Sequence, residues 1–574
     1  MSPRITIDSE SRVLEVASEV RLGDALVQAG IPISLYCGRR GRCGKCAVEI
    51  LSGDIPPLDE PERILLESRR LPSDRFRLAC RLPVRGDLTV RIPESSFIPS
   101  ARILAHGAGK FVRLDPSVRK IAGRRSEALG ASAVSEQLDA GESPEEILTT
   151  VLGPEDEVLA LERTDTTSRL FGLAVDLGTT TLVVDLVDLR TGTVIATAVG
   201  RNGQSAFGAD VVSRITAAFR DPGQAEALRR AVLTSLNGLI AEAGRAGSVR
   251  SDEIYETVIA GNTAMGHLFL GLPVDGLAVA PFETNHLSPS PIPASASGLT
   301  VNPAGRVVLA PHLHSFVGGD ITAGLLALDL PSRPGNVLFI DLGTNGELVL
   351  KTDRSLTATS TAAGPAFEGM SISCGLPAQS GAVDKAVWDP DEGRLIVQTI
   401  GTGPARGVCG TGLVDVIAVF LRRGGLNAQG RILHPDKRLA VTPDLALIPS
   451  DIREVQLAAA AVKTGIRMLL AAEELEIADL DQVLVAGAFG ASLDVENAVR
   501  IGLLPRIPEG RIRFVGNTSL EGARAMLLSR VERGLAARIA GQVGHLPLAQ
   551  DDAFQRMFVD ALEFREWPDA DPHP

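Results

Sequence analysis

The chain has 574 residues, of which 45% are hydrophobic and 22% are charged, a composition typical of globular proteins and a length that predicts about two to four domains. Its formal net charge of −13 argues against a nucleic-acid binder, which needs a basic surface to neutralise phosphates, so no nucleic-acid partner is expected. The N-terminus lacks the apolar segment of a signal peptide, and no run of about 18 apolar residues follows, so we expect a cytoplasmic protein without a membrane partner.

The first 95 residues alternate apolar and polar side chains, which is typical of β-strands. The alternation predicts strands over residues 4–7, 13–16, 47–50 and 88–92. One short helix is expected over residues 22–29, with Gly30 at its end.

Four of the six cysteines lie in this region, at Cys37, Cys43, Cys46 and Cys80. Four thiolates are the number that an iron–sulfur cluster requires. Zinc is the chemical alternative, but it usually takes two Cys-x-x-Cys pairs, and Cys43 and Cys46 form the one pair in the chain. Four unconnected buried cysteines are the other alternative. We therefore predict that these four side chains ligate a [2Fe–2S] cluster.

The loop between the first and third of these cysteines is rich in glycine and in basic residues. Gly38, Gly41 and Gly44 provide the backbone freedom that turns N–H groups toward the sulfur atoms. The basic side chains are those of Arg39, Arg40, Arg42 and Lys45. They form either a solvated loop or a surface that docks a partner. Five residues, 38–42, separate the first two cysteines where plant-type ferredoxins have four, so the motif resembles the adrenodoxin-like variant of that fold.

Residues 96–168 predict a connector and a small middle domain. Two short amphipathic helices are expected, over residues 119–138 and 143–152. The second starts with Ser143-Pro144-Glu145-Glu146, which places proline at the first helical position.

From about residue 169 onward, apolar strands alternate with helices, which is typical of a large α/β unit. Strands are expected over residues 172–177, 180–189 and 193–199, and helices over residues 209–219 and 224–243. A strand, a turn and a second strand return over residues 337–350.

Two segments of this unit share one pattern: an apolar strand that ends in Asp176 or Asp341, a tight turn, and a second apolar strand. The turn residues are Gly178, Thr179, Thr180 and Thr181 in the first copy and Gly343, Thr344, Asn345 and Gly346 in the second. Backbone N–H groups and threonine hydroxyls can bind phosphate oxygens, and the two carboxylates can hold Mg²⁺ through water. One copy alone is explained equally well by a β-turn, but two copies predict a nucleoside triphosphate site.

A third segment, residues 483–490, is an apolar strand that runs into a turn containing Gly487, Ala488 and Gly490. This turn either lets an adenosine approach closely or is only a buried strand and turn. The three segments together resemble the actin-like ATPase superfamily of sugar and acetate kinases, heat-shock chaperones and actin. The resemblance implies two related lobes that hold ATP and Mg²⁺, with Asp176 and Asp341 as the catalytic residues, the two turns on the phosphates and the third turn on the adenosine.

A [2Fe–2S] domain joined to an actin-like ATPase resembles the reductive activators of corrinoid-dependent methyltransferases. The resemblance covers nearly the whole chain and includes residues 202–214, 260–265, 316–321 and 361–369. It implies a multidomain α+β and α/β fold. An N-terminal β-grasp [2Fe–2S] ferredoxin-like domain (1–95) is followed by a linker and small middle domain (96–168). A two-lobed actin-like ATPase domain of the ribonuclease H-like type (169–574) comes last, with lobes at about 169–334 and 335–574.

The resemblance also implies an activity: an ATP-dependent corrinoid reductase that transfers an electron from its cluster to cob(II)alamin on a corrinoid protein, regenerating cob(I)alamin for methyl transfer. An external electron donor (a reductase, ferredoxin or flavodoxin) and a homodimer are expected with it. The alternative is a small-molecule kinase of the actin-like superfamily with a regulatory [2Fe–2S] sensor domain. A kinase would yield a phosphorylated product, whereas an activator needs ATP turnover and a corrinoid partner.

The two remaining cysteines, Cys374 and Cys409, are expected to be buried and structural. Activators of 2-hydroxyacyl-CoA dehydratases bridge a [4Fe–4S] cluster with two cysteines per subunit, but Thr361 stands where the first of these ligands would align. His312 and His314 are expected in a loop rather than in a metal site.

Three further acidic residues lie in or beside the glycine-rich segments: Asp320, Glu347 and Glu368. Each could position water for ATP hydrolysis. A helix-capping role is at least as well supported for Asp320.

Overall fold

The structure is a computed structural model of the whole chain. It describes residues 3–8, 12–29, 31, 33, 41, 44, 46–68, 71–93, 96, 112–124, 146–208, 210–401, 403–487, 493–508, 510–548 and 552–567.

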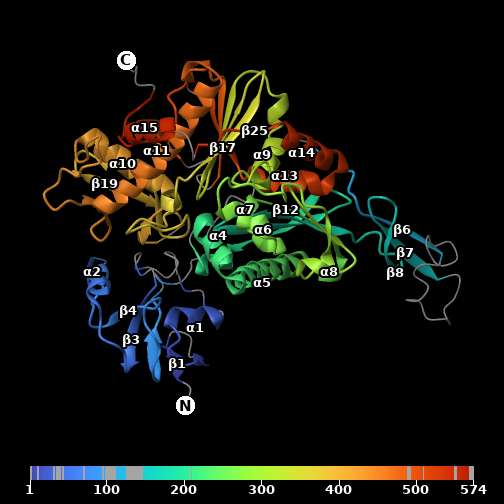
Figure 1. Ribbon diagram of the computed structural model, residues 1–574, viewed down its shortest axis with the longest axis horizontal. Coiled ribbons are helices and arrows are strands. Elements are labelled where there is room, and N and C mark those ends of the chain that lie inside the picture. The colour runs from blue at the N-terminus through green and yellow to red at the C-terminus, as the bar shows by residue number, and fades with distance from the viewer. Residues whose placement is uncertain are drawn as a thin grey trace.

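The N-terminal part is a five-stranded sheet in the order β2-β1-β5-β3-β4, accompanied by two helices (Figure 1). Its elements are β1 (Arg4–Ile7), β2 (Arg12–Glu15), α1 (Leu22–Gln28), β3 (Ala47–Gly53), α2 (Glu60–Ser68), β4 (Phe76–Leu78) and β5 (Leu88–Arg91). β1 pairs antiparallel with β2 and parallel with β5, and the fully buried side chains of Ile5, Ile7 and Leu26 belong to one hydrophobic core. The four predicted strands and the first helix are confirmed. The helix is capped at Ala29, and Gly30 lies outside the described residues.

A three-stranded antiparallel sheet follows, with β6 (Arg119–Arg124), β7 (Ile147–Leu152) and β8 (Val158–Arg163) in that order. The helices predicted over residues 119–138 and 143–152 are therefore wrong wherever the structure describes them; residues 125–145 lie outside the described part. The reason is visible in β7, whose Ile-Leu-Thr-Thr-Val-Leu sequence is mostly β-branched and favours a strand. The prediction gave more weight to the helix-start signal Ser143-Pro144-Glu145-Glu146 than to this preference for a strand.

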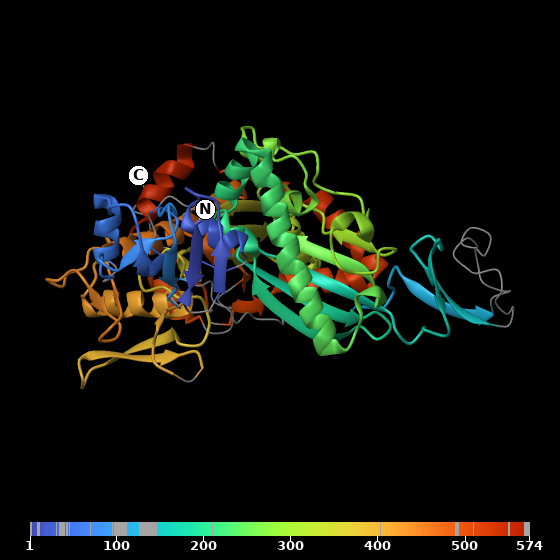
Figure 2. The same ribbon diagram turned by 90° about the horizontal axis from the view of Figure 1, so that it is seen from below.

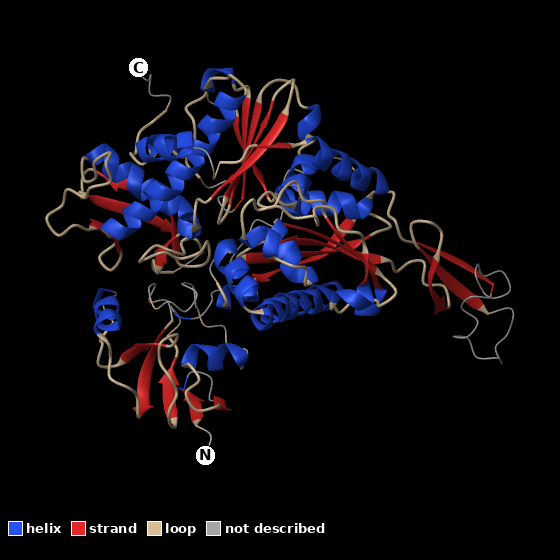
Figure 3. Cartoon of the chain, in the orientation of Figure 1, coloured by secondary structure: helices blue, strands red, loops and turns tan. Residues whose placement is uncertain are grey.

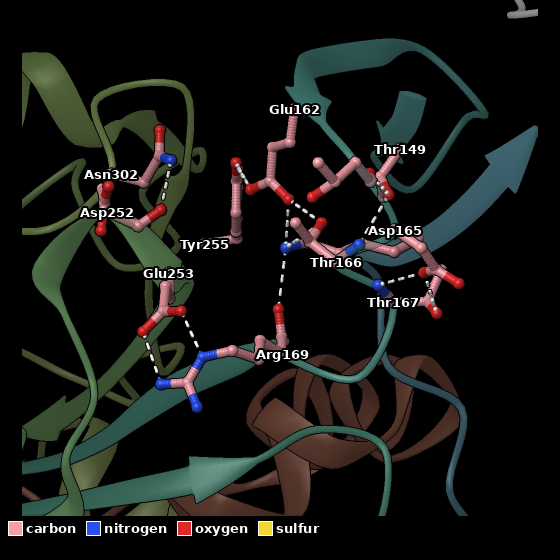
Figure 4. Close-up of polar contacts among 12 residues, drawn as sticks. Thr149, Glu162, Asp165, Thr166, Thr167, Arg169, Asp252, Glu253, Tyr255 and Asn302 are labelled. Atoms are coloured by element: carbon pink, nitrogen blue, oxygen red, sulfur yellow. Dashed lines mark hydrogen bonds and ion pairs between the residues drawn. The ribbon is translucent and has the colours of Figure 1, made fainter. Parts of the chain in front are cut away.

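Polar contacts anchor this small sheet to the following domain (Figure 4). The hydroxyl of Tyr255 donates to Glu162 at 2.6 Å, and the buried Lys120 ammonium group donates to the same carboxylate at 2.6 Å. Lys120 also donates to the carbonyl oxygen of Arg169 at 2.7 Å, and Arg169 forms an ion pair with Glu253. The partly buried network joins β8 to the start of the large α/β unit.

The first lobe of that unit is a six-stranded sheet in the order β11-β10-β9-β12-β14-β13. Its strands are β9 (Phe171–Leu177), β10 (Thr181–Asp188), β11 (Thr193–Arg201), β12 (Ile254–Gly261), β13 (Ile292–Pro293) and β14 (Arg306–Leu309). Its helices are α4 (Val211–Arg220), α5 (Pro222–Gly247), α6 (Thr263–Leu270), α7 (Asp275–Ala278), α8 (Ala294–Ser297) and α9 (Gly319–Ala327). The long helix α5 runs along one face of the sheet, against β10 and β11 (Figure 2). The strands and helices predicted in this region are confirmed.

The second lobe is a six-stranded sheet in the order β24-β23-β15-β16-β17-β25. Its strands are β15 (Val337–Leu342), β16 (Gly346–Lys351), β17 (Leu356–Thr361), β23 (Gln482–Gly487), β24 (Ile512–Gly516) and β25 (Gly544–His545). Two smaller sheets contain β18 (Ala382–Asp389), β19 (Arg394–Thr399), β20 (Gly407–Val408), β21 (Leu439–Ala440) and β22 (Ala446–Leu447). The helices are α10 (Gly410–Arg423), α11 (Pro449–Ala472), α12 (Val495–Arg500), α13 (Thr518–Leu528), α14 (Arg530–Gln542) and α15 (Asp552–Ala561).

The two large sheets repeat one topology (Figure 3). In each, a three-stranded antiparallel meander is extended by two parallel strands: β12 and β14 after β9 in the first lobe, β23 and β24 after β15 in the second. Helices α9 and α13 pack against each other where the lobes meet, so that Val183, Phe339 and Leu520 share one buried core. The duplication predicted from the two hairpins is therefore a duplication of lobes.

Helix α11 is the one described helix whose length and mean hydropathy would suit a membrane span. Its most apolar stretch is 78% buried, and residues such as Val455, Val462 and Leu469 belong to the core of the second lobe. Such burial is typical of a core helix.

Candidate functional site

The turns of both predicted hairpins line a single cavity of about 660 Å³ between the lobes. The predicted residues that line it are Asp176, Gly178, Thr179, Thr180, Thr181, Asp341, Gly343, Thr344, Asn345 and Gly487. Gly346 does not line it: this residue starts β16 and is buried under the Thr361 side chain. Ala488 and Gly490 lie outside the described residues.

Asparagine side chains hold the first turn in place. The Nδ2 group of Asn202 donates to the carbonyl oxygen of Gly178 at 3.0 Å, and that of Asn262 donates to the hydroxyl of Thr179 at 3.0 Å. Asn262 is also the N-cap of α6, so the start of that helix and the turn are positioned together. Sequence reasoning did not assign either asparagine a role, although both lie in segments shared with the reductive activators.

Six carboxylates line the cavity, and four of them, those of Asp176, Asp320, Asp341 and Glu347, lie close enough to interact electrostatically. Burial raises the pKa of Asp341 to about 7, and the neighbouring charges of Asp320 and Asp176 add to this effect. Burial likewise raises the pKa of Asp320 to about 7. The mutual repulsion of these groups would be relieved by a bound cation.

The environments of these carboxylates differ. Asp176 accepts hydrogen bonds from the Nδ2 group of Asn517 at 2.8 Å and from the hydroxyl of Ser519 at 2.9 Å, both at the start of α13. Asp320 is not the N-cap of α9, which is Gly318, but its carboxylate accepts a hydrogen bond from the Ile321 N–H at 2.9 Å in the first turn of that helix. Among the described residues, no three His, Cys, Asp or Glu side chains are grouped closely enough to enclose a metal ion. Mg²⁺ commonly keeps several of its own water molecules, and the carboxylates of the cavity suit such a water-mediated contact.

The residues around the predicted cluster are described in part. Cys46 and Cys80 are 1% and 2% exposed, and Cys37 and Cys43 lie outside the described residues. The backbone N–H of Ala79 donates to the carbonyl oxygen of Cys46 at 3.0 Å, which places the segments of Cys46 and Cys80 side by side. Gly41 and Gly44 have φ angles of +64° and +65°, the left-handed backbone that the glycine-rich loop requires. Two buried thiols on adjoining segments beside such a loop fit a thiolate-ligated cluster.

The two remaining cysteines and His312 lie in surroundings that suit structural residues. Cys409 is buried, its thiol donates to the carbonyl oxygen of Val383 at 3.2 Å, and burial raises its pKa. Cys374 is only partly buried. The buried His312 accepts a hydrogen bond from the Gly319 N–H at 2.9 Å, as a loop residue would.

Gly487 brings β23 against the second hairpin, and its replacement tests that close approach. A Cβ atom at Gly487 would lie 2.2 Å from the carbonyl oxygen of Leu342 and 2.8 Å from Oδ1 of Asp341. Gly487→Ala is therefore expected to lower the free energy of unfolding by about 1–3 kcal/mol in urea titrations and to weaken ATP binding.

Gly510→Ala is the matched control for Gly487→Ala. Gly487 has a φ of +95° and Gly510 one of +87°, but a Cβ atom at Gly510 would have no atom of the described residues within 4 Å. If the two substitutions lowered stability and ATP binding equally, backbone strain, rather than contact with the hairpin, would account for the effect of Gly487→Ala.

Three family models match the chain in succession. They are a 2Fe-2S iron-sulfur cluster binding domain over residues 5–85, the RACo middle region over residues 171–333, and the C-terminal ASKHA domain of RACo over residues 335–571. These matches confirm the predicted [2Fe–2S] domain and the predicted actin-like ATPase fold.

Two of the following proteins resemble the chain along nearly its whole length, and the third along about two thirds of it. A solved structure described as a reductive activator for corrinoid, iron-sulfur protein is 31% identical, covers 98% of each chain and has a TM-score of 0.72. The corrinoid activation enzyme RamQ of Eubacterium limosum is 30% identical over 95% of this chain and 96% of its own. The Co(II) methylated amine-specific corrinoid protein reductase of Methanosarcina barkeri is 25% identical over 69% of this chain and 77% of its own. With these relatives and with the three models matching in order, the chain belongs to the RACo family, in which a [2Fe–2S] domain is joined to an ASKHA domain.

Proposed function

We propose that this protein is an ATP-dependent corrinoid reductase that returns the Co(II) of an inactive corrinoid protein to Co(I). The observation that carries the proposal is the pairing, in one chain, of a buried cysteine site with an interlobe cavity lined by two phosphate-type hairpins. Relatives that match over 95–98% of the chain are named for corrinoid activation. A one-electron carrier and an ATP site in one enzyme account for both halves of the molecule.

The four cysteines Cys37, Cys43, Cys46 and Cys80 would hold the [2Fe–2S] cluster. A bound cluster supplies a one-electron carrier. Burial of Cys46 and Cys80 keeps water away from this side of the site, while the basic loop residues 39–45 provide positive charge for docking an acidic partner or an electron donor.

The interlobe cavity would hold ATP and Mg²⁺. The hydroxyls and backbone N–H groups of the two turns suit the phosphate oxygens, and Asp176 and Asp341 suit the water shell of the cation. The glycine-rich turn at Gly487, Ala488 and Gly490 would take the adenosine. Because the two hairpins belong to different lobes, ATP can favour one lobe arrangement over another. A difference in affinity between those arrangements is what coupling to cobalt reduction requires.

The proposed partners are a corrinoid protein of a methyltransferase system and an external reductase, ferredoxin or flavodoxin. We place the protein in the cytoplasm and expect a homodimer there. Resemblance to the reductive activators supports each of these assignments. Gel filtration with light scattering would test the homodimer.

The function is tested by reduction of a purified methyltransferase corrinoid protein held in the Co(II) state. With a chemical reductant, ATP and Mg²⁺, the cluster-loaded protein should remove the Co(II) electron paramagnetic resonance signal, and omission of ATP should slow this strongly. Signal that persists in the presence of ATP would contradict the proposal. The alternative, a sugar-type kinase with a redox sensor, would instead transfer labelled phosphate from ATP to a small molecule without any corrinoid protein.

A further inference from the structure

The carboxylate of Glu368 lies directly between the two phosphate-type hairpins. Its Oε2 atom accepts a hydrogen bond from the Thr180 hydroxyl at 2.8 Å, and its Oε1 atom accepts one from the Thr344 hydroxyl at 2.8 Å. The two hydroxyl oxygens are 3.4 Å apart. A Cβ atom built on Gly343 would lie 4.0 Å from Oε1, so the carboxylate also lies against the second turn itself.

Positive charge also acts on the same carboxylate. Burial raises the pKa of Glu368, whereas the two threonine hydroxyls, Arg201 of the cavity lining and the fully buried Arg214 all favour its ionised form and oppose that rise. The Nη2 atom of Arg214 has no hydrogen-bond partner within the described part of the chain. Two hydroxyl donors and the positive charge of two arginines favour an anion at this position, and the chain places its own carboxylate there.

A nucleotide phosphate would need the same donors. Carboxylate and phosphate oxygens accept hydrogen bonds from hydroxyl groups in the same way, and each threonine hydroxyl has one proton to donate. A phosphate on Thr180 and Thr344 would therefore have to take both hydrogen bonds from Glu368, and the two negative charges would repel each other at that distance.

Displacement of Glu368 would change the packing of the second lobe. Glu368 ends the 3₁₀ turn Pro365–Glu368, which packs against helices α10 and α11. Movement of the carboxylate away from the hairpins would shift this turn against the core helices of its own lobe and release the hydrogen-bonded link to the first lobe.

We infer that Glu368 is an internal competitor of the nucleotide phosphates: it joins the lobes through Thr180 and Thr344 when ATP is absent, and ATP must displace it to bind. This inference rests on the proposed ATP site. It assigns Glu368 a role in setting nucleotide affinity and in the lobe rearrangement.

Calorimetric titration of the full-length, cluster-loaded protein with the Mg²⁺ complex of a non-hydrolysable ATP analogue tests this role. Glu368→Gln and Glu368→Ala are each expected to lower the dissociation constant by about tenfold, because the phosphates no longer compete with a charged acceptor of two hydrogen bonds. Glu368→Asp, whose shorter side chain cannot span both hydroxyls, should give a smaller change in the same direction and provides a variant that keeps the charge.

Asp384→Asn is the matched control, because Asp384 lines the same cavity but has no hydrogen bond to either threonine in the described structure. Equal tightening in Asp384→Asn would mean that net charge in the cavity, not competition by Glu368, sets the affinity, and would overturn the inference. Weaker binding in the Glu368 variants would also overturn it, since Glu368 would then contribute to ATP binding. A wild-type protein that binds no nucleotide would instead refute the proposed ATP site.

Discussion

Replacement of Cys46 by serine is expected to abolish corrinoid reduction while ATP binding persists. A serine hydroxyl is a much poorer iron ligand than a thiolate, and Cys46 is 1% exposed beside the segment of Cys80, as a buried ligand would be. The iron content should fall from about two atoms per chain to well under one, and the visible absorption of the cluster should be lost. ATP binding should remain, because the cavity residues belong to a different part of the chain.

Cys374→Ser is the matched control for this substitution. Cys374 is a partly buried cysteine in the second lobe and is not a proposed ligand, so the variant should keep the iron content and the rate of Co(II) reduction of the wild type. A Cys46→Ser protein that reduces cobalt at the wild-type rate would refute the assignment of the cluster as the electron carrier.

The elements that were predictable from the sequence are those with a strong local signal. The alternating strands of the N-terminal sheet and the hairpin strands around Asp176 and Asp341 have apolar patterns that can be recognised without knowledge of the tertiary packing. The strand β4 was not predictable, because it has three residues and forms only by pairing with β3. In β7 a local helix-start signal misled the prediction, since pairing on both sides determines that strand.

The two turns that line the cavity were predictable from the sequence, but the polar groups that complete the site were not. Two matching hairpins indicate that their turns meet, because related lobes place equivalent turns at one interface. By contrast, Asn517 donates to Asp176 across 341 positions of sequence, and Glu368 joins two threonines that lie 188 and 24 positions away. No periodicity connects such positions. Tertiary packing alone determines which polar side chain reaches a given turn.

Replacement of Asp341 by asparagine is expected to lower ATP hydrolysis by about 100-fold and to lower ATP-dependent cobalt reduction with it. The amide has the size of the carboxylate but lacks the charge that holds Mg²⁺, and Asp341 lines the cavity at the end of β15. The iron content should be unchanged. Asp353→Asn is the control: this side chain is 82% exposed, pairs with Lys351 and lies outside the cavity, so its activities should match those of the wild type.

The stability of the same variant separates a cation-binding role from a merely structural one. Burial holds the pKa of Asp341 at about 7 in the folded protein, well above its ordinary value of 3.8. The folded state therefore binds more protons than the unfolded state between about pH 4 and pH 7, and the free energy of unfolding falls as the pH rises through that range. Without Mg²⁺ or ATP, Asp341→Asn should be more stable than the wild type at pH 8, by on the order of 1–3 kcal/mol, and about equally stable near pH 4.

Mg²⁺ and ATP together should stabilise the wild type much more than the variant, because the bound cation removes the cost of the buried charge. Thermal unfolding at pH 4 and pH 8, with and without the Mg²⁺–ATP complex, measures all of these differences. A variant that gains stability at pH 8 yet hydrolyses ATP at the wild-type rate would show that Asp341 is a buried acid outside the catalytic machinery. Loss of hydrolysis together with loss of the Mg²⁺-dependent stabilisation is the result that a cation held by Asp341 requires.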